Sequence, residues 1–93
     1  MVTHIVFWNL NDVPEKEQNA AEMKRRLEAL AGVVPGLVDA AVRRGFGGWD
    51  LCLVSHHTSR AALEEYQQHP AHLEVKTFVH SVVRERASCD FED

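Results

Sequence analysis

The stretch VTHIVFWNL, residues 2–10, is apolar along most of its length and rich in β-branched and aromatic residues. This composition predicts a β-strand that is covered on both faces. Side chains alternate along a strand, so one face carries Val2, His4, Val6 and Trp8, and the other carries Thr3, Ile5 and Phe7. A strand of this kind needs a cover on each face.

The remaining chain predicts five further elements. Apolar residues spaced by three and four favour a helix over residues 15–31. Asp12 and Glu15 resemble a capping box at the start of this helix, and Gly32 is expected to end it. The GFGG segment, residues 45–48, predicts a hairpin between strands at 37–44 and 49–57. Helical segments at 60–68 and 71–80 are separated by His69-Pro70, and a last strand is expected at 81–91. Within residues 37–44, alternation places Val38, Ala40 and Val42 on one face and Leu37, Asp39, Ala41 and Arg43 on the other.

The order strand, helix, strand, strand, helix, strand predicts an α+β, ferredoxin-like βαββαβ fold, with a single domain over residues 1–93. Right-handed crossovers give an antiparallel four-stranded sheet with its helices on one face. The other face then carries Ile5, Phe7, Ala41, Cys52 and Val54 without a cover. A patch of this kind marks an interface, so we expect a homodimer, a dimeric α/β barrel, formed through the helix-free face.

Composition narrows the classes of function. The 93 residues carry a formal net charge of −4 and show no basic stripe, which argues against nucleic-acid binding. No apolar run is long enough to span a membrane, and the start lacks the pattern of a signal peptide. Cys52 and Cys89 are far apart and suit free thiols in a reducing compartment. We therefore expect a cytoplasmic protein without nucleic-acid or membrane partners.

No strong catalytic motif is present: the sequence has no phosphate loop, zinc-finger spacing or nucleophile elbow. The six histidines are the most notable feature. A metal site would need His4, His69 and His72 to converge, and no carboxylate or cysteine spacing supports one, so we expect neither metal nor cofactor. His56 and His57 are expected in solvent at a strand end, and His80 beside the second helical region.

Tyr66 and His72 form the most promising pair. If the His4 face of the first strand meets the helices, a phenol and an imidazole project into a pocket floored by Val6, Trp8, Leu51 and Leu53. An imidazole there can act as a general base, and a tyrosine can hold an enolate oxygen. The alternative is structural: Tyr66 is a core aromatic residue with a bonded hydroxyl, and His72 caps the following helix. The residues alone favour this structural alternative.

The block ALEEYQQHPAH, residues 62–72, together with VTHIVF (2–7), VPGL (34–37) and WDL (49–51), resembles the Dabb family, the stress-responsive dimeric α/β-barrel domain. The resemblance covers nearly the whole chain and implies the fold and a homodimer. In one branch, the plant polyketide cyclases, a Y-x-x-H-P-A-H block supplies the catalytic pair of an intramolecular aldol step. By that resemblance His72 is the base and Tyr66 orients the substrate. The candidate substrate-binding residues are His4, Val6, Trp8, Leu51, Leu53, His69 and Val75.

The chain also departs from that branch. Its first helix offers Ala20, Met23 and Leu27 without aromatic lining, and Leu51 stands where the cyclases have a pocket histidine. The resemblance therefore implies binding of a small apolar or keto-containing molecule, with cyclase-like or lyase-like proton transfer at Tyr66 and His72. Two alternatives stay open. One is a non-catalytic, stress-related binding or structural protein. The other is a small dimeric α/β-barrel monooxygenase, in which haem would require His72 or His69 as axial ligand.

Overall fold

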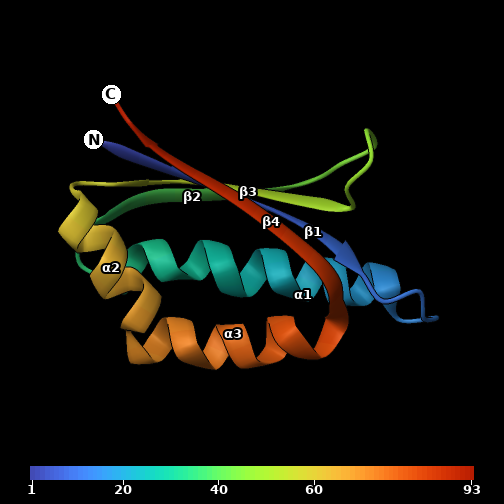
Figure 1. Ribbon diagram of the computed structural model, residues 1–93. Helices are drawn as coiled ribbons and strands as arrows, with labels where there is room; N and C mark the ends of the chain where they lie inside the picture. Colours follow the sequence, from blue (N-terminus) through green and yellow to red (C-terminus); the bar gives the residue numbers. More distant parts are fainter.

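The computed structural model describes residues 1–93 and has two layers (Figure 1). The strands are β1 (Val2–Leu10), β2 (Leu37–Arg44), β3 (Leu51–His57) and β4 (Val83–Glu92). The helices are α1 (Lys16–Ala29), α2 (Arg60–Gln68) and α3 (Pro70–Val82), with a 3₁₀ turn, η1 (Leu30–Gly32), after α1. The sheet is antiparallel in the order β2-β3-β1-β4, which confirms the predicted ferredoxin-like fold.

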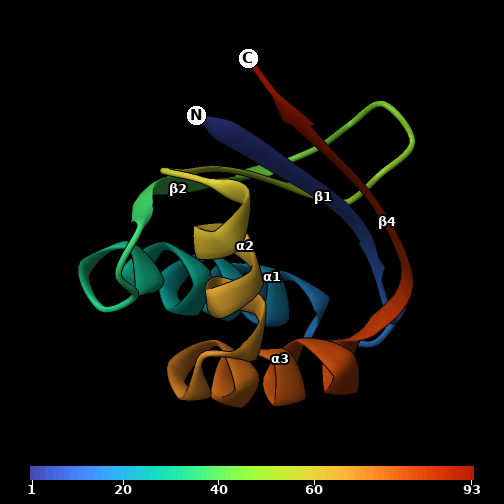
Figure 2. The same ribbon diagram turned by 60° about the vertical axis from the view of Figure 1, so that its left-hand side comes forward.

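All three helices lie on one face of the sheet, and the other face has no helix over it (Figures 1 and 2). The covered face holds the main core, in which Val6, Trp8, Leu53 and Met23 are each at most 4% exposed. On the helix-free face Ile5, Phe7, Ala41, Cys52 and Val54 are half-buried. Phe7 packs there on Trp49, with 5.9 Å between the ring centroids. The predicted division of β1 into two apolar faces is therefore correct.

The boundaries of several elements differ from the predictions. The start of α1 has no side-chain cap, so the expected capping box of Asp12 and Glu15 is wrong; Glu15 occupies the N-cap position. β3 begins at Leu51 rather than residue 49, because the connection is closed by the bond from Gly45 N–H to the carbonyl of Asp50. α3 runs on to Val82, because buried Val79 and Val82 extend its apolar stripe, so β4 begins two residues later than expected.

The predicted alternation of β2 is wrong at its start. The register with β3 shifts between Leu37 and Asp39, and this bulge turns Leu37 into the core while Val38 is 49% exposed. After the bulge, Val42 faces the core as expected.

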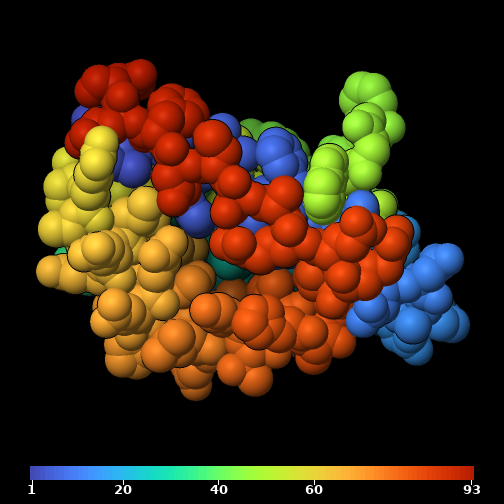
Figure 3. Space-filling view, in the orientation of Figure 1, coloured from blue at the N-terminus to red at the C-terminus, as the bar shows by residue number.

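The first and last residues lie side by side at one edge of the molecule (Figures 1 and 2). β1 and β4 are antiparallel neighbours, and Asp93 N–H donates to the carbonyl of Met1 over 3.3 Å. At the other end of the sheet the β2–β3 connection stands away from the body (Figure 3), and Phe46 in it is fully exposed. No helix combines the length and apolar character needed to cross a membrane.

Candidate functional site

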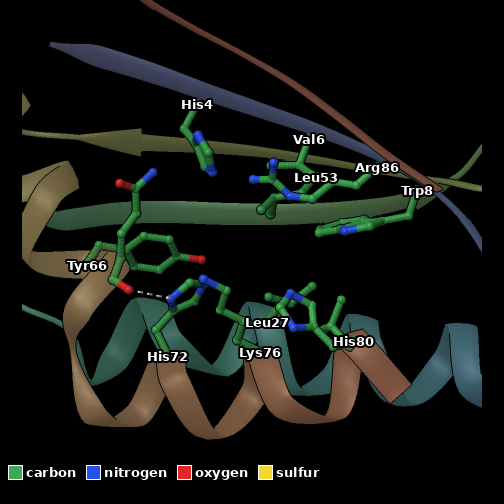
Figure 4. A pocket seen from close by; sticks show the side chains of 12 residues that line it. His4, Val6, Trp8, Leu27, Leu53, Tyr66, His72, Lys76, His80 and Arg86 are labelled. Atoms are coloured by element: carbon green, nitrogen blue, oxygen red, sulfur yellow. Dashed lines mark hydrogen bonds between the residues drawn. The ribbon is translucent and has the colours of Figure 1, made fainter. Parts of the chain in front are cut away.

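A cavity of about 400 Å³ lies between the sheet and α3, and Figure 3 shows the surface hollowed between β4 and the α2–α3 region. This volume falls in the usual range for small-molecule sites. Its lining combines apolar side chains from the sheet, α1 and α3 with polar side chains from β1, α2, α3 and β4 (Figure 4). The lining residues are His4, Val6, Trp8, Leu27, Leu53, Tyr66, Gln67, His72, Lys76, Val79, His80 and Arg86.

Tyr66 comes from the last turns of α2, a helix that begins where the Ser59 side chain accepts a hydrogen bond from Ala62 N–H. Ala62, Leu63 and Tyr66 form its buried face, and Tyr66 is 1% exposed. Burial raises the pKa of its phenol to about 12, so the hydroxyl keeps its proton near neutral pH. In Figure 4 this hydroxyl points into the cavity, with no hydrogen bond to the other residues drawn. It can therefore donate to a bound molecule.

His72 lies in the first turn of α3, directly beside Tyr66. The chain breaks at His69, whose extended backbone (ψ 134°) precedes Pro70 at the first helical position, as the sequence predicts. The rings of Tyr66 and His72 are 4.3 Å apart between centroids, inclined by 34°. Burial lowers the pKa of His72, so its imidazole is neutral at pH 7.

A contact with the backbone orients the His72 ring. Its Nδ1 lies 3.4 Å from the carbonyl oxygen of Gln67, a long hydrogen bond drawn as the dashed line in Figure 4. A carbonyl only accepts, so this contact favours the tautomer with the proton on Nδ1. The lone pair then lies on Nε2, where a base needs it.

His4 forms the wall opposite this pair. The residue is 4% exposed, and Nδ1 hydrogen-bonds to the carboxylate of Asp90, its cross-strand neighbour on β4. The His4 and Tyr66 ring centroids are 6.2 Å apart. Because Nδ1 is held by the carboxylate, Nε2 is the ring nitrogen left for a molecule in the cavity.

His57 lies behind Tyr66, and its expected solvent exposure is wrong. It is 0% exposed because Leu51, Leu53, Ser55 and His57 alternate onto the covered face of β3. Its Nε2 is 3.0 Å from the Ser55 hydroxyl, Nδ1 has no hydrogen-bond partner, and its ring centroid is 4.9 Å from that of Tyr66. His56, on the opposite face, is half-buried and contacts Asp39.

Comparison with known proteins identifies the family. Residues 2–93 match the family described as the "Stress responsive A/B Barrel Domain". The chain belongs to the Dabb family. None of the curated proteins compared with it matches this chain.

Solved structures agree with this assignment. A "dimeric protein of unknown function and ferredoxin-like fold" from Bacteroides fragilis is 26% identical, with a TM-score of 0.90 over 99% of this chain and 95% of that one. A protein from Arabidopsis thaliana is 21% identical, with a TM-score of 0.85 over 100% and 95%. SnoaB from Streptomyces nogalater, described as a "cofactor-independent oxygenase", is 16% identical, with a TM-score of 0.81 over 99% and 91%. The last two support the fold alone.

The Dabb fold brings together most of the residues that the sequence singles out. Tyr66, His72 and His4 meet at the cavity, and Val6, Trp8 and Leu53 line its sheet side. Three candidates do not line it. Leu51 and Val75 are packed into the core, and the Nδ1 of His69 accepts a hydrogen bond from Ala71 N–H as the cap of α3.

Sequence reasoning missed half of the lining, including Lys76 and His80 on α3 and Arg86 on β4. A signal for the α3 residues was present: His72, Lys76 and His80 follow one another at intervals of four and so share a helix face. Arg86 alternates with Ser88 and Asp90 on the covered face of β4, but its position depends on the strand register, which the sequence does not give. The structure holds no group of three or more side chains placed to bind a metal ion.

Proposed function

We propose that this Dabb domain binds a small apolar or keto-containing molecule in the cavity and removes a proton from it through His72. The adjacency of Tyr66 and His72, with the phenol directed into the cavity, is the observation that carries the proposal. The imidazole of His72 is neutral and offers a lone pair, while the phenol of Tyr66 stays protonated and offers a hydrogen-bond donor. A carbon acid needs these two groups together.

The chemistry follows from these two groups. Nε2 of His72 takes a proton from the carbon next to a carbonyl, and the electrons of that C–H bond move onto the carbonyl oxygen. The hydroxyl of Tyr66 donates to this enolate oxygen. If the molecule holds a second carbonyl within reach, the enolate carbon attacks it, a C–C bond forms, and the new alkoxide takes up the proton from His72. The result is an intramolecular aldol step of the polyketide-cyclase type.

The test is turnover of a linear poly-β-keto thioester by Tyr66→Phe and His72→Ala variants. We expect each to lower kcat by at least about 100-fold, which is typical for loss of a positioned acid-base or oxyanion group. The melting temperature should change little for Tyr66→Phe, because the buried ring is kept. Thr77→Ala, on the exposed side of α3, is the control and should retain wild-type turnover. Wild-type turnover in both site variants would refute the proposal.

We also infer that the domain works as a homodimer joined through the helix-free face of the sheet. Its apolar side chains have no helix to cover them, and exposed apolar patches of this kind mark interfaces. The Bacteroides fragilis relative is described as dimeric. The cavity lies on the opposite side of the sheet, so each subunit would carry a complete one. Sedimentation at micromolar concentration tests this, and a stable monomer would overturn it.

Oxygenation is the second candidate, because SnoaB, with the same fold, is described as a cofactor-independent oxygenase. The same deprotonation at His72 would give a carbanion that reacts with dioxygen in place of a second carbonyl. An oxygen electrode separates the two reactions: the aldol step consumes no oxygen, and oxygenation consumes it in proportion to substrate.

A further inference from the structure

The charged residues at the cavity depart from the pattern of the rest of the chain. Of the ten Lys and Arg residues, seven form ion pairs with Asp or Glu in this structure. The three without such a pair are Arg43, Lys76 and Arg86, and the last two line the cavity. No Asp or Glu lines it. The chain has a net charge of −4, yet the cavity beside Tyr66 and His72 carries two positive charges that have no Asp or Glu partner.

Two separate elements deliver these charges. Lys76 lies one helical turn after His72 on α3, and Arg86 reaches in from β4 (Figure 4). Burial is the main cause that lowers the pKa of His72, and the charges of Lys76 and Arg86 also act to lower it, against the Gln67 carbonyl, which raises it. Two like charges without a partner repel each other, and an anion between them would remove this repulsion. The planar guanidinium of Arg86 also suits a carboxylate, which it can bind with two parallel hydrogen bonds.

We propose that the natural ligand of the cavity is a keto acid whose carboxylate is held between Lys76 and Arg86. Its apolar part lies along Val6, Leu53 and Val79, and its carbonyl end reaches Tyr66 and His72. This inference rests on the proposed function, since it assigns the substrate class of the same cavity. The lysine and the arginine recognise the ligand, while the tyrosine and the histidine carry out the chemistry.

Calorimetric binding of 4-oxononanoate and of its amide, 4-oxononanamide, tests the proposal. The two molecules have nearly the same shape and differ in the charge of one end. We expect the acid to bind at least tenfold more tightly at low salt, and 0.5 M salt to reduce that advantage because Lys76 and Arg86 are exposed to solvent. In the Lys76→Gln/Arg86→Gln double variant the acid should bind no better than the amide. Arg25→Gln, which removes a cation from the exposed side of α1, should behave as wild type.

The outcomes separate this inference from the proposed function. Equal binding of acid and amide by the wild-type protein would overturn the keto-acid proposal and leave the cavity as a site for neutral molecules. Undiminished preference for the acid in the double variant would also overturn it, because the charge would then be recognised elsewhere. If neither molecule binds, the keto-acid proposal fails, and the turnover of the poly-β-keto thioester by the two site variants decides the proposed function by itself. If the acid binds as expected but Tyr66→Phe and His72→Ala keep full turnover, the keto-acid site stands and the proton transfer does not.

Discussion

Acidification should destabilise this protein through His57, and the size of the effect can be worked out from the surroundings of this side chain. His57 is fully buried, one ring nitrogen has no partner, and burial is the main cause that lowers its pKa from 6.5 to about 4, with nearby His4 second. The folded chain therefore prefers the neutral ring, whereas the unfolded chain binds a proton near pH 6.5. The stability that depends on a neutral His57 is complete above pH 6.5 and is lost as the pH falls towards 4.

The magnitude follows from the two pKa values. A difference of about 2.5 between the folded and unfolded chains corresponds to roughly 3 kcal/mol. About 2 kcal/mol of this loss falls between pH 7.5 and pH 5. Urea unfolding at a fixed protein concentration measures it, and the concentration is held constant because a dimer's stability depends on it.

The comparison variant is His57→Gln, which cannot titrate. We expect it to start less stable than wild type, because a buried side chain has been changed, but to lose about 2 kcal/mol less between pH 7.5 and pH 5. An NMR titration of the wild-type ring gives the pKa of His57 directly. An identical loss in the two proteins, or a His57 pKa near 6.5, would refute the reasoning.

Three further results are expected. Phe7→Ala should raise the dimer dissociation constant measured by sedimentation at least tenfold, because burying a phenylalanine contributes about 2 kcal/mol. Leu73→Ala, at an exposed position, should leave that constant unchanged. Equal dissociation constants for Phe7→Ala and the wild-type protein would place Phe7 outside the interface. Gly36→Ala should lower the free energy of unfolding by about 2 kcal/mol. Gly36 has φ +84°, and an added Cβ would lie 2.6 Å from Ala62 Cβ, so the substitution strains the backbone and creates a clash. Urea unfolding identical to that of the wild-type protein would contradict this prediction. As the pH increases, kcat/KM should rise to a plateau with its midpoint below pH 6.5, because burial lowers the pKa of His72 and the base is neutral above that pKa. A midpoint above pH 6.5 would contradict this prediction.

Alternation in the strands made much of the fold predictable. The pattern of Val2–Leu10 alone separates the covered face from the helix-free face, and the His69-Pro70 break correctly divides the second helical region. Local patterns failed where a neighbouring element decides the outcome. The bulge at Leu37 depends on the register with β3, and the end of α3 depends on what Val82 packs against.

The site was predictable to a different degree. Tyr66 and His72 lie six residues apart around a proline break, so their meeting is a local matter, and the block that resembles the Dabb family contains both. The burial of His57 could have been read from the same alternation that placed Leu51 and Leu53 inside. Arg86 reaches the cavity only through the pairing of β4 with β1, across more than seventy residues of sequence. Contacts of this range come from topology and register, which single-sequence patterns do not supply.

The adjacency of residues 1 and 93 has a practical consequence for engineering. A short glycine-serine peptide could join them, and the resulting ring could be reopened at Gly47, in the exposed connection at the far end of the sheet. Such a circularly permuted chain would keep every strand and helix intact. It would also place its new ends at the far end of the sheet from the point where β1 begins and β4 ends, so that a tag or a surface tether could be attached there.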